Sequence, residues 1–350
     1  MGGANPSHPL ESRIRRMPES PEVTVVIPTR NRWSYLSLTL ASVLGQEDVD
    51  LEAIVVDDGS GDGTGGWLAV LGDRRVRTIC HARPHGVAGA RNAGLAAARG
   101  DWVAFLDDDD IWAPRKLRTQ LDAAQRAGTS FAYTAAVVID ETGAVIDREA
   151  PPPDPRELPA VLFRGNLIPA PGSNIVARTA VVRRLGGFDE AARFDDWDMW
   201  IRLSAAERGA ACPEVLVAYR RHRRNRALGN RDSLRPGLAY LVRKHRALAA
   251  EHGVRFDEAA FARWIAFCQR RAGRPLRAAR TCLDSAWKQR NPADLARGAL
   301  VLVGPWAAWH WRPQAPPATP AWLEPYQASQ VTAESSSPTS VSAADRPLAD

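Results

Sequence analysis

Residues 23–60 read VTVVIPTRNRWSYLSLTLASVLGQEDVDLEAIVVDDGS and are the most informative part of the chain. A Val-rich run that ends at Ile27 is followed by helical periodicity from Trp33 to Leu44, and then by a second apolar run up to Val56. Two apolar runs on either side of one helix indicate a β-α-β unit, whose strands are parallel. We therefore predict that an α/β domain begins at about residue 22.

The alternation of strand and helix patterns continues to about residue 115. Helical periodicity recurs at residues 64–71 and 87–98, and apolar strand-like runs recur at residues 76–80 and 102–106. Strands that alternate with helices form a mostly parallel sheet covered on both faces. Later strands are expected at residues 130–139, 173–177 and 215–219, later helices at residues 179–185 and 198–207, and only helices at residues 232–310.

The composition is that of an ordinary globular protein. Hydrophobic residues make up 45% of the 350 residues and charged residues 25%, which excludes a wholly disordered chain and an integral membrane protein. No apolar run is long enough to span a membrane, and the N-terminal residues lack the apolar core of a signal peptide. The four cysteines form no C-x-x-C pair, which argues against a disulfide framework. We therefore expect a cytoplasmic protein.

Charge and composition divide the chain into four regions. The formal charge is about −5 over residues 1–210, about +14 over residues 211–312 and about −3 over the remainder, which gives the total of +6. Both ends of the chain are polar and contain proline, as disordered segments do. The prediction is a disordered tail at 1–21, an α/β domain at 22–225, a basic helical region at 226–312 and a disordered tail at 313–350.

Acidic side chains gather at three places where a strand or loop ends. The groups are Asp57 with Asp58, Asp107 to Asp110, and Asp195 with Asp196 and Asp198. In an open α/β sheet, ligands bind beyond the carboxyl ends of the strands, where the first two groups lie. Consecutive carboxylates repel one another unless water or a cation neutralises them, and oxygen ligands select Mg²⁺ or Mn²⁺. The sequence favours a divalent-metal site, with a solvated acidic turn as the alternative.

A series of short motifs resembles glycosyltransferase family 2. The motifs are Val25 to Arg32, Ser42 to Gln46, Ile54 to Ser60, Gly86 with Ala90 to Leu95, Gly100 to Trp102, Phe105 to Asp110, Gly186 to Asp189, and Asp195 to Leu203. Each motif is weak alone, but the ordered set is specific. The resemblance implies a nucleotide-diphospho-sugar transferase (GT-A) fold with a C-terminal helical appendage. It also implies an inverting enzyme that passes a sugar from a nucleotide-diphosphate donor to a hydroxyl of a glycan, lipid-linked or other cell-envelope acceptor.

The resemblance also gives roles to individual residues. It implies nucleotide-sugar binding by Pro28, Thr29, Arg30, Asp58, Arg91, Asp107 and Asp108, and metal binding by Asp109, Asp107 and His222. Asp109 is the expected Mg²⁺ or Mn²⁺ ligand, with Asp110 as an alternative because four consecutive Asp leave the register open. A carboxylate at Asp58 suits an imide N–H, which favours UDP or dTDP. Asp196 is the expected general base, and Asp195 precedes it.

Other functions fit parts of the sequence less well. Gly61 to Gly66 matches the G-x-G-x-x-G pattern of a dinucleotide-binding oxidoreductase, but it follows the second strand rather than the first. A nucleotidyltransferase would open with a glycine-rich phosphate loop, and residues 27–33 contain no glycine. A non-catalytic binding module is a further alternative. Cys80, His81 and His85 are near one another, but three ligands at this spacing favour a structural explanation over zinc.

The basic region, Arg220 to Arg312, predicts contact with an anionic surface. No nucleic-acid recognition fold is visible, so nucleic acid is not an expected partner. Positive charge attracts anionic lipids, and tryptophan favours the headgroup boundary. The tryptophans of the region are Trp264, Trp287, Trp306, Trp309 and Trp311. We predict peripheral contact with the inner face of the cell membrane; tryptophans packed on the α/β domain would give the same pattern.

Overall fold

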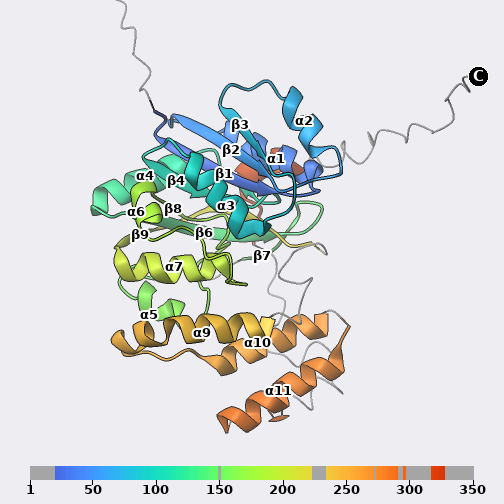
Figure 1. The fold of residues 1–350 in the computed structure, drawn as a ribbon, viewed down its shortest axis with the longest axis vertical. Coiled ribbons are helices and arrows are strands. Elements are labelled where there is room, and N and C mark those ends of the chain that lie inside the picture. The colour runs from blue at the N-terminus through green and yellow to red at the C-terminus, as the bar shows by residue number, and fades with distance from the viewer. Residues whose placement is uncertain are drawn as a thin grey trace, which may run out of the picture.

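The computed structural model describes residues 20–148, 151–222, 234–271, 273–290, 295–296 and 317–327. A central sheet lies between two layers of helices, and the helices of residues 234–289 lie beyond one of these layers (Figure 1). The strands are β1 (Val23–Thr29), β2 (Leu51–Asp57), β3 (Val76–Cys80), β4 (Trp102–Phe105), β5 (Ile111–Trp112), β6 (Phe131–Ile139), β7 (Val145–Arg148), β8 (Val176–Arg178) and β9 (Gly209–Arg220).

The first half of the sheet is parallel, as the sequence predicts. Strands β3, β2, β1 and β4 lie side by side in this order and run in the same direction. The pairing of Thr29 with Asp57 brings the carboxyl ends of β1 and β2 to one edge of the sheet. Both strands are buried along their whole length because helices cover both faces.

The second half of the sheet is mixed, so antiparallel strands join the parallel ones in the complete sheet. Strand β8 is antiparallel to both β4 and β6, and β6 is parallel to β9. The short strands β5 and β7 are antiparallel to β9 and β6. Strand direction depends on which distant segments pair, and the residue pattern within one strand does not contain this information.

The helices are α1 (Trp33–Leu44), α2 (Thr64–Val70), α3 (Gly86–Ala97), α4 (Lys116–Ala127), α5 (Leu158–Leu162), α6 (Thr179–Arg184), α7 (Asp195–Ala206), α9 (Leu234–Glu251), α10 (Glu258–Arg271), α11 (Pro275–Gln289) and the 3₁₀ helix η3 (Ala321–Leu323). Three of the helices before residue 233 differ from the prediction, and two of these, α4 and α5, were not expected. Helix α4 was missed because it is largely polar, although Leu117, Leu121 and Ala124 form a buried stripe. Helix α7 begins at Asp195 and not at Asp198.

Alternate residues of β1 face two separate hydrophobic cores. Val26 packs in the core that contains residues of α3 and α7, whereas Val25 and Ile27 pack in the core that contains residues of α1 and α4. Gly94 of α3 lies so close to β1 that a Cβ atom there would come within 2.3 Å of a Val26 methyl carbon. The absence of a side chain at Gly94 therefore lets α3 lie directly on the sheet.

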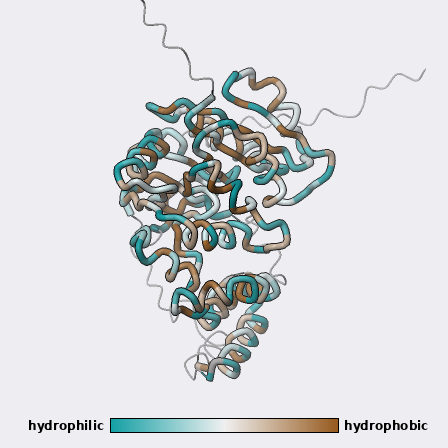
Figure 2. The backbone as a smooth tube through the Cα atoms, turned by 60° about the vertical axis from the view of Figure 1, so that its left-hand side comes forward, coloured by the Kyte–Doolittle hydropathy of each residue, from teal (hydrophilic) through white to brown (hydrophobic). Residues whose placement is uncertain are grey.

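Helices α9 and α10 pack on the α/β domain. Leu241 and Ala249 of α9 belong to the same core as Trp197 of α7, and Phe261 of α10 packs against it. Figure 2 shows hydrophobic and hydrophilic segments alternating along these lower helices, as expected for helices with one buried face. Within the described ranges, no helix combines the length and apolarity needed to cross a bilayer.

Residues 317–327 fall in the predicted C-terminal disordered tail but are ordered against the sheet. Leu323 is fully buried in a small core with Ala218 of β9, and the Trp322 indole N–H donates to the Val215 carbonyl at 3.1 Å. Apolar side chains in an otherwise polar segment explain this packing. The rest of the predicted tails, residues 1–19, 313–316 and 328–350, lies outside the described residues.

Candidate active site

A cavity of about 630 Å³ lies at the carboxyl ends of β1, β2 and β4. Every residue predicted to bind the nucleotide sugar lines it: Pro28, Thr29, Arg30, Asp58, Arg91, Asp107 and Asp108. The predicted metal ligand Asp109 and the predicted base Asp196 also line it. His222 does not line the cavity, but its Nε2 lies 2.7 Å from Asp109 Oδ2.

Asp58 is held at the start of α3. Its Oδ1 accepts the backbone N–H of His85 at 2.8 Å and lies 2.9 Å from His81 Nδ1, and its Oδ2 accepts the backbone N–H of Gly86 at 2.8 Å. Burial alone would raise the pKa of Asp58, but these hydrogen bonds outweigh it and lower the pKa. Asp58 is therefore a fixed carboxylate, and His81 has the structural role that was expected.

Arg91 joins two of the acidic groups. Its guanidinium donates to Asp107 at 2.6 Å and to Asp195 at 2.7 Å. Gly172 covers this pair so closely that a Cβ atom there would come within 2.3 Å of Asp107 Oδ2. The Arg91 Nε is buried and has no hydrogen-bond partner in the described part of the chain. Arg91 thus neutralises carboxylates from the β4 end and from α7, and keeps one N–H for a ligand.

Arg32, which no sequence pattern singled out as a site residue, bridges two neighbouring carboxylates. Its Nη1 donates to Asp108 Oδ1 at 3.0 Å and to Asp109 Oδ2 at 2.8 Å. Asp108 also accepts the Thr29 hydroxyl at 2.7 Å. The sequence signal for Arg32 is its place at the end of the Val25 to Arg32 motif, but its contacts to residues more than 70 positions away cannot be read from local pattern.

Asp110 holds the acidic loop in place and does not line the cavity. Its carboxylate accepts the Ser173 hydroxyl and the backbone N–H of Arg220, the latter at 2.8 Å. Burial, followed by repulsion from Asp109 and Asp107, raises the pKa of Asp110. These contacts occupy the Asp110 carboxylate away from the cavity, so Asp109 is the more suitable of the two expected metal ligands.

Arg220 is buried in the domain, although it was counted in the basic surface region. Its Nε donates to the Asp109 carbonyl at 3.0 Å, and its Nη1 donates to the carbonyls of Asp140 and Glu141, both at 3.1 Å. Arg220 therefore supports the acidic loop from behind and is not available to a membrane.

Asp195 and Asp196 are the first two residues of α7 and have different surroundings. Both line the cavity, but Asp195 is buried and paired with Arg91, whereas Asp196 is half-buried and accepts the backbone N–H of Trp197 at 2.7 Å. Burial, followed by repulsion from Asp195, raises the pKa of Asp196 to about 7. A half-buried carboxylate with a raised pKa suits a general base, because its proton affinity is close to that needed at neutral pH.

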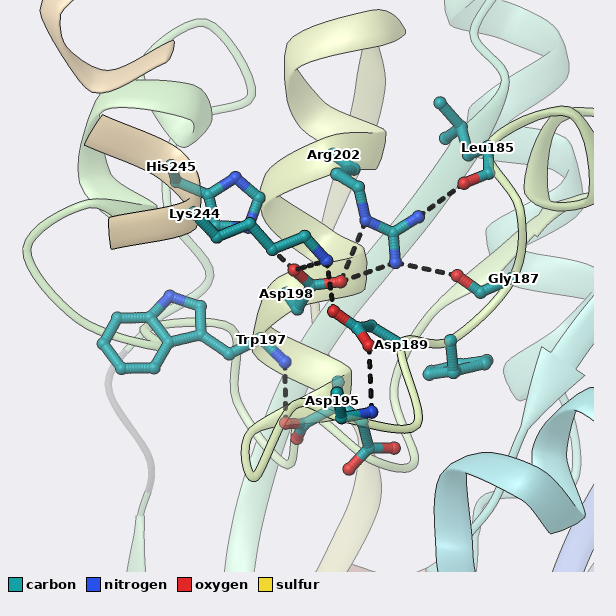
Figure 3. Close-up of polar contacts among 12 residues, drawn as sticks. Leu185, Gly187, Asp189, Asp195, Trp197, Asp198, Arg202, Lys244 and His245 are labelled. Carbon is teal, nitrogen blue, oxygen red and sulfur yellow. Dashed lines mark hydrogen bonds and ion pairs between the residues drawn. The ribbon is translucent and has the colours of Figure 1, made fainter. Parts of the chain in front are cut away.

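The far side of α7 is fixed by a cluster of charges around Asp198 (Figure 3). Asp198 is fully buried and accepts hydrogen bonds from Arg202 at 2.6 Å, from His245 at 2.8 Å and from Lys244 at 2.7 Å. Burial alone would raise the pKa of Asp198, but the contacts with His245, Lys244 and Arg202 lower it. Lys244 also donates to Asp189 at 2.6 Å. Helix α9 thus holds the helix that begins with Asp195 and Asp196.

The described part of the chain contains no group of three His, Cys, Asp or Glu side chains arranged to hold a metal ion. Mg²⁺ is commonly bound by one or two carboxylates together with substrate phosphates. Asp107 and Asp109 both line the cavity, and the Asp107 side chain keeps 33% of its surface exposed. This donor set fits a divalent ion whose coordination is completed by a diphosphate.

The sheet order and the acid-lined cavity at the carboxyl ends of its parallel strands define the nucleotide-diphospho-sugar transferase (GT-A) fold, as the sequence predicted. The same fold is found in a mannosyltransferase from Pyrobaculum calidifontis, solved in complex with GDP-Man and Mn2+. The two structures align with a TM-score of 0.53 and 20% sequence identity, over 89% of this chain and 86% of that one.

Residues 24–186 match the model of glycosyl transferase family 2, and this part of the chain belongs to that family. The chain is 44% identical over 112 residues to the succinoglycan biosynthesis protein ExoO of Rhizobium meliloti, which is 32% of each protein. It is 36% identical over 111 residues to WfgD of Escherichia coli, a UDP-Glc:alpha-D-GlcNAc-diphosphoundecaprenol beta-1,3-glucosyltransferase, covering 32% of this chain and 44% of WfgD. These matches span less than half the length of either relative. They confirm the resemblance to glycosyltransferase family 2.

Proposed function

We propose that the protein is an inverting glycosyltransferase that uses a UDP- or dTDP-linked sugar and a divalent metal. The observation that carries this proposal is the meeting of two acidic groups at one cavity. Asp107 to Asp109 come from the end of β4, and Asp195 and Asp196 come from the start of α7. The group after β4 suits the diphosphate and its metal, and the group at the start of α7 supplies the general base.

The hydrogen bonds of Asp58 favour a uracil or thymine base. A carboxylate offers about four lone-pair sites, and contacts with His81, His85 and Gly86 occupy three of them. The remaining site on Oδ2 can accept one N–H, as the imide of uracil or thymine supplies. The edge of guanine presents two adjacent donors, which one free site cannot satisfy. This argument supports UDP and dTDP over GDP.

Asp107 and Asp109 would hold the metal, which stabilises negative charge on the departing nucleoside diphosphate. The unpartnered Nε of Arg91 and the exposed Arg30 can donate to the same phosphates. Asp196 removes the proton of the acceptor hydroxyl as its oxygen attacks the anomeric carbon. Because Asp195 is paired with Arg91, only Asp196 of this pair can take up that proton, and a single displacement inverts the configuration.

The acceptor we propose is a glycan or lipid-linked sugar of the cell envelope. ExoO is named for succinoglycan biosynthesis, and WfgD for an acceptor on diphosphoundecaprenol. Both names support an acceptor of this class. Peripheral contact with the inner face of the membrane would give access to such a lipid, and this contact is part of the proposal.

Thermal unfolding with nucleotides tests the donor site, because a ligand that binds the native state raises its stability. UDP or dTDP with Mn²⁺ should raise the melting temperature more than GDP with Mn²⁺ or UDP with EDTA. Asp109→Asn should lose the Mn²⁺-dependent rise and most turnover, whereas Asp101→Asn, at an exposed position, should keep both. Stronger stabilisation by GDP would refute the assignment of uracil or thymine as the nucleobase. No response to any nucleotide would refute the proposed function.

A further inference from the structure

One wall of the cavity is built by residues outside the part of the chain that matches the family. Ala260, Phe261 and Trp264 of α10 line the cavity together with Asp196 and Trp197 of α7. The family match ends at residue 186. Helix α10 therefore contributes directly to the cavity that contains the proposed base.

This wall is aromatic and ends in an exposed ring. Trp197 and Phe261 are stacked, with ring centroids 5.3 Å apart and an interplanar angle of 23°. Trp264 continues the group, 5.2 Å from Phe261 and 6.4 Å from Phe194. Trp197 is only 2% exposed, whereas Trp264 is 38% exposed. Trp264 thus presents apolar surface to the cavity, and a ligand that covers this surface gains stability from its burial.

A polar group without a partner lies on the same cavity. Asn166 lines it, and the Asn166 Oδ1 is buried without a hydrogen-bond partner among the described residues. Buried polar atoms are normally paired, so such an atom indicates a missing donor. Arg164, two residues earlier, is exposed and also lines the cavity. An aromatic plate next to hydrogen-bonding groups matches a sugar ring, which has an apolar C–H face and a rim of hydroxyls.

We propose that Trp264 and Phe261 form an acceptor subsite in which Trp264 stacks on the apolar face of a sugar ring, with a ring hydroxyl directed to Asp196. This inference rests on the proposed glycosyltransferase function and adds the residues that bind the acceptor sugar. The sugar reaches the site either as a free glycan or on a lipid diphosphate, and the stacking chemistry is the same for both.

Saturation-transfer NMR on the full chain with UDP and Mn²⁺ tests this subsite, with methyl β-D-glucopyranoside and methyl N-acetyl-β-D-glucosaminide as probes. At least one glycoside should bind the wild type. Trp264→Ala and Trp264→Leu should weaken its binding by at least about tenfold, because they remove the flat ring that covers the sugar. Trp264→Tyr should retain most of the affinity, since it keeps a flat ring.

Trp287→Ala is the matched control, because Trp287 is 88% exposed on α11 and does not line the cavity. It should leave glycoside binding unchanged, and all four variants should keep the UDP affinity of the wild type. Equal binding by Trp264→Leu and Trp264→Tyr would show that Trp264 only packs, and would overturn the proposal. A wild type that binds UDP but neither glycoside would also overturn the proposal. A wild type that does not bind UDP would instead refute the underlying glycosyltransferase function.

N-acetylglucosamine 1-phosphate distinguishes the two sources of the sugar. A lipid-diphosphate source predicts that this probe binds more tightly than the methyl glycoside and that Arg164→Ala removes the difference. A free glycan predicts equal binding of the two probes. In both cases the sugar should bind Trp264→Leu more weakly than it binds the wild type. A phosphate probe that binds the two proteins equally well would count against the subsite.

Discussion

At the scale of single residues, the raised pKa of Asp196 links activity to pH. A base must be ionised, and burial together with Asp195 raises the pKa of Asp196 to about 7. The acid limb of kcat/KM should therefore lie near pH 7, above the value of about 3.9 for an ordinary aspartate. Asp196→Asn should lower kcat by roughly 10² to 10⁴ and leave donor affinity nearly unchanged. Asp195→Asn should have a milder effect on turnover.

Replacing Asp196 with Asn should raise the stability of the folded protein by an amount that depends on pH. Because the folded-state pKa of Asp196 lies above its unfolded value, ionisation above pH 7 costs the folded state free energy, and this cost is absent below the unfolded pKa. Asp196→Asn should therefore melt at a higher temperature than the wild type at pH 8, and the difference should shrink towards pH 4. Melting curves in EDTA without nucleotide measure this. A difference that is independent of pH would contradict the assigned environment.

At the scale of elements, α9 controls the position of α7. His245 and Lys244 bind Asp198, which lies two residues after the proposed base on the same helix. His245→Ala should lower the free energy of unfolding by roughly 2 kcal/mol, because it leaves a cavity and removes a partner of a buried carboxylate. It should also lower kcat without changing UDP affinity. Arg246→Ala, at an exposed position one residue further along α9, is the control. Loss of stability with kcat unchanged would show that α9 does not position the base.

Local patterns predict the elements that depend on neighbouring residues. The apolar runs of β1 and β2 and the helix α1 between them are each local, and they were predicted correctly. The antiparallel direction of β8 and the support of Asp110 by Arg220 were not predictable, since they join segments far apart in the chain. Motif order predicted which residues line the cavity, but α10 carries no motif, so Trp264 was not assigned to it.

At the scale of the whole molecule, negative charge gathers in the domain that contains the site, and positive charge gathers in the helical region after it. The described tryptophans of the basic region have different surroundings, because Trp264 faces the cavity whereas Trp287 is 88% exposed on α11. Leu276 and Leu283, which are 76% and 45% exposed, lie 11 and 4 residues before Trp287 and share its helix face. Trp306, Trp309 and Trp311 lie outside the described residues. The exposed apolar face of α11 is therefore the described surface best suited to a bilayer.

Co-sedimentation with lipid vesicles tests whether this face contacts a membrane. Basic residues near an anionic surface contribute up to about 1 kcal/mol each, so the wild type should bind vesicles rich in phosphatidylglycerol, not neutral ones, and high salt should release it. Trp287→Ala combined with Leu283→Ala should weaken binding because it removes inserted apolar surface. Trp264→Tyr should bind as the wild type does, because Trp264 faces the cavity. These point variants are preferred to a chain that ends at residue 230, because that truncation would also remove Leu241 and Ala249 from the core. A wild type that ignores anionic vesicles at low salt would show that the positive charge serves another purpose.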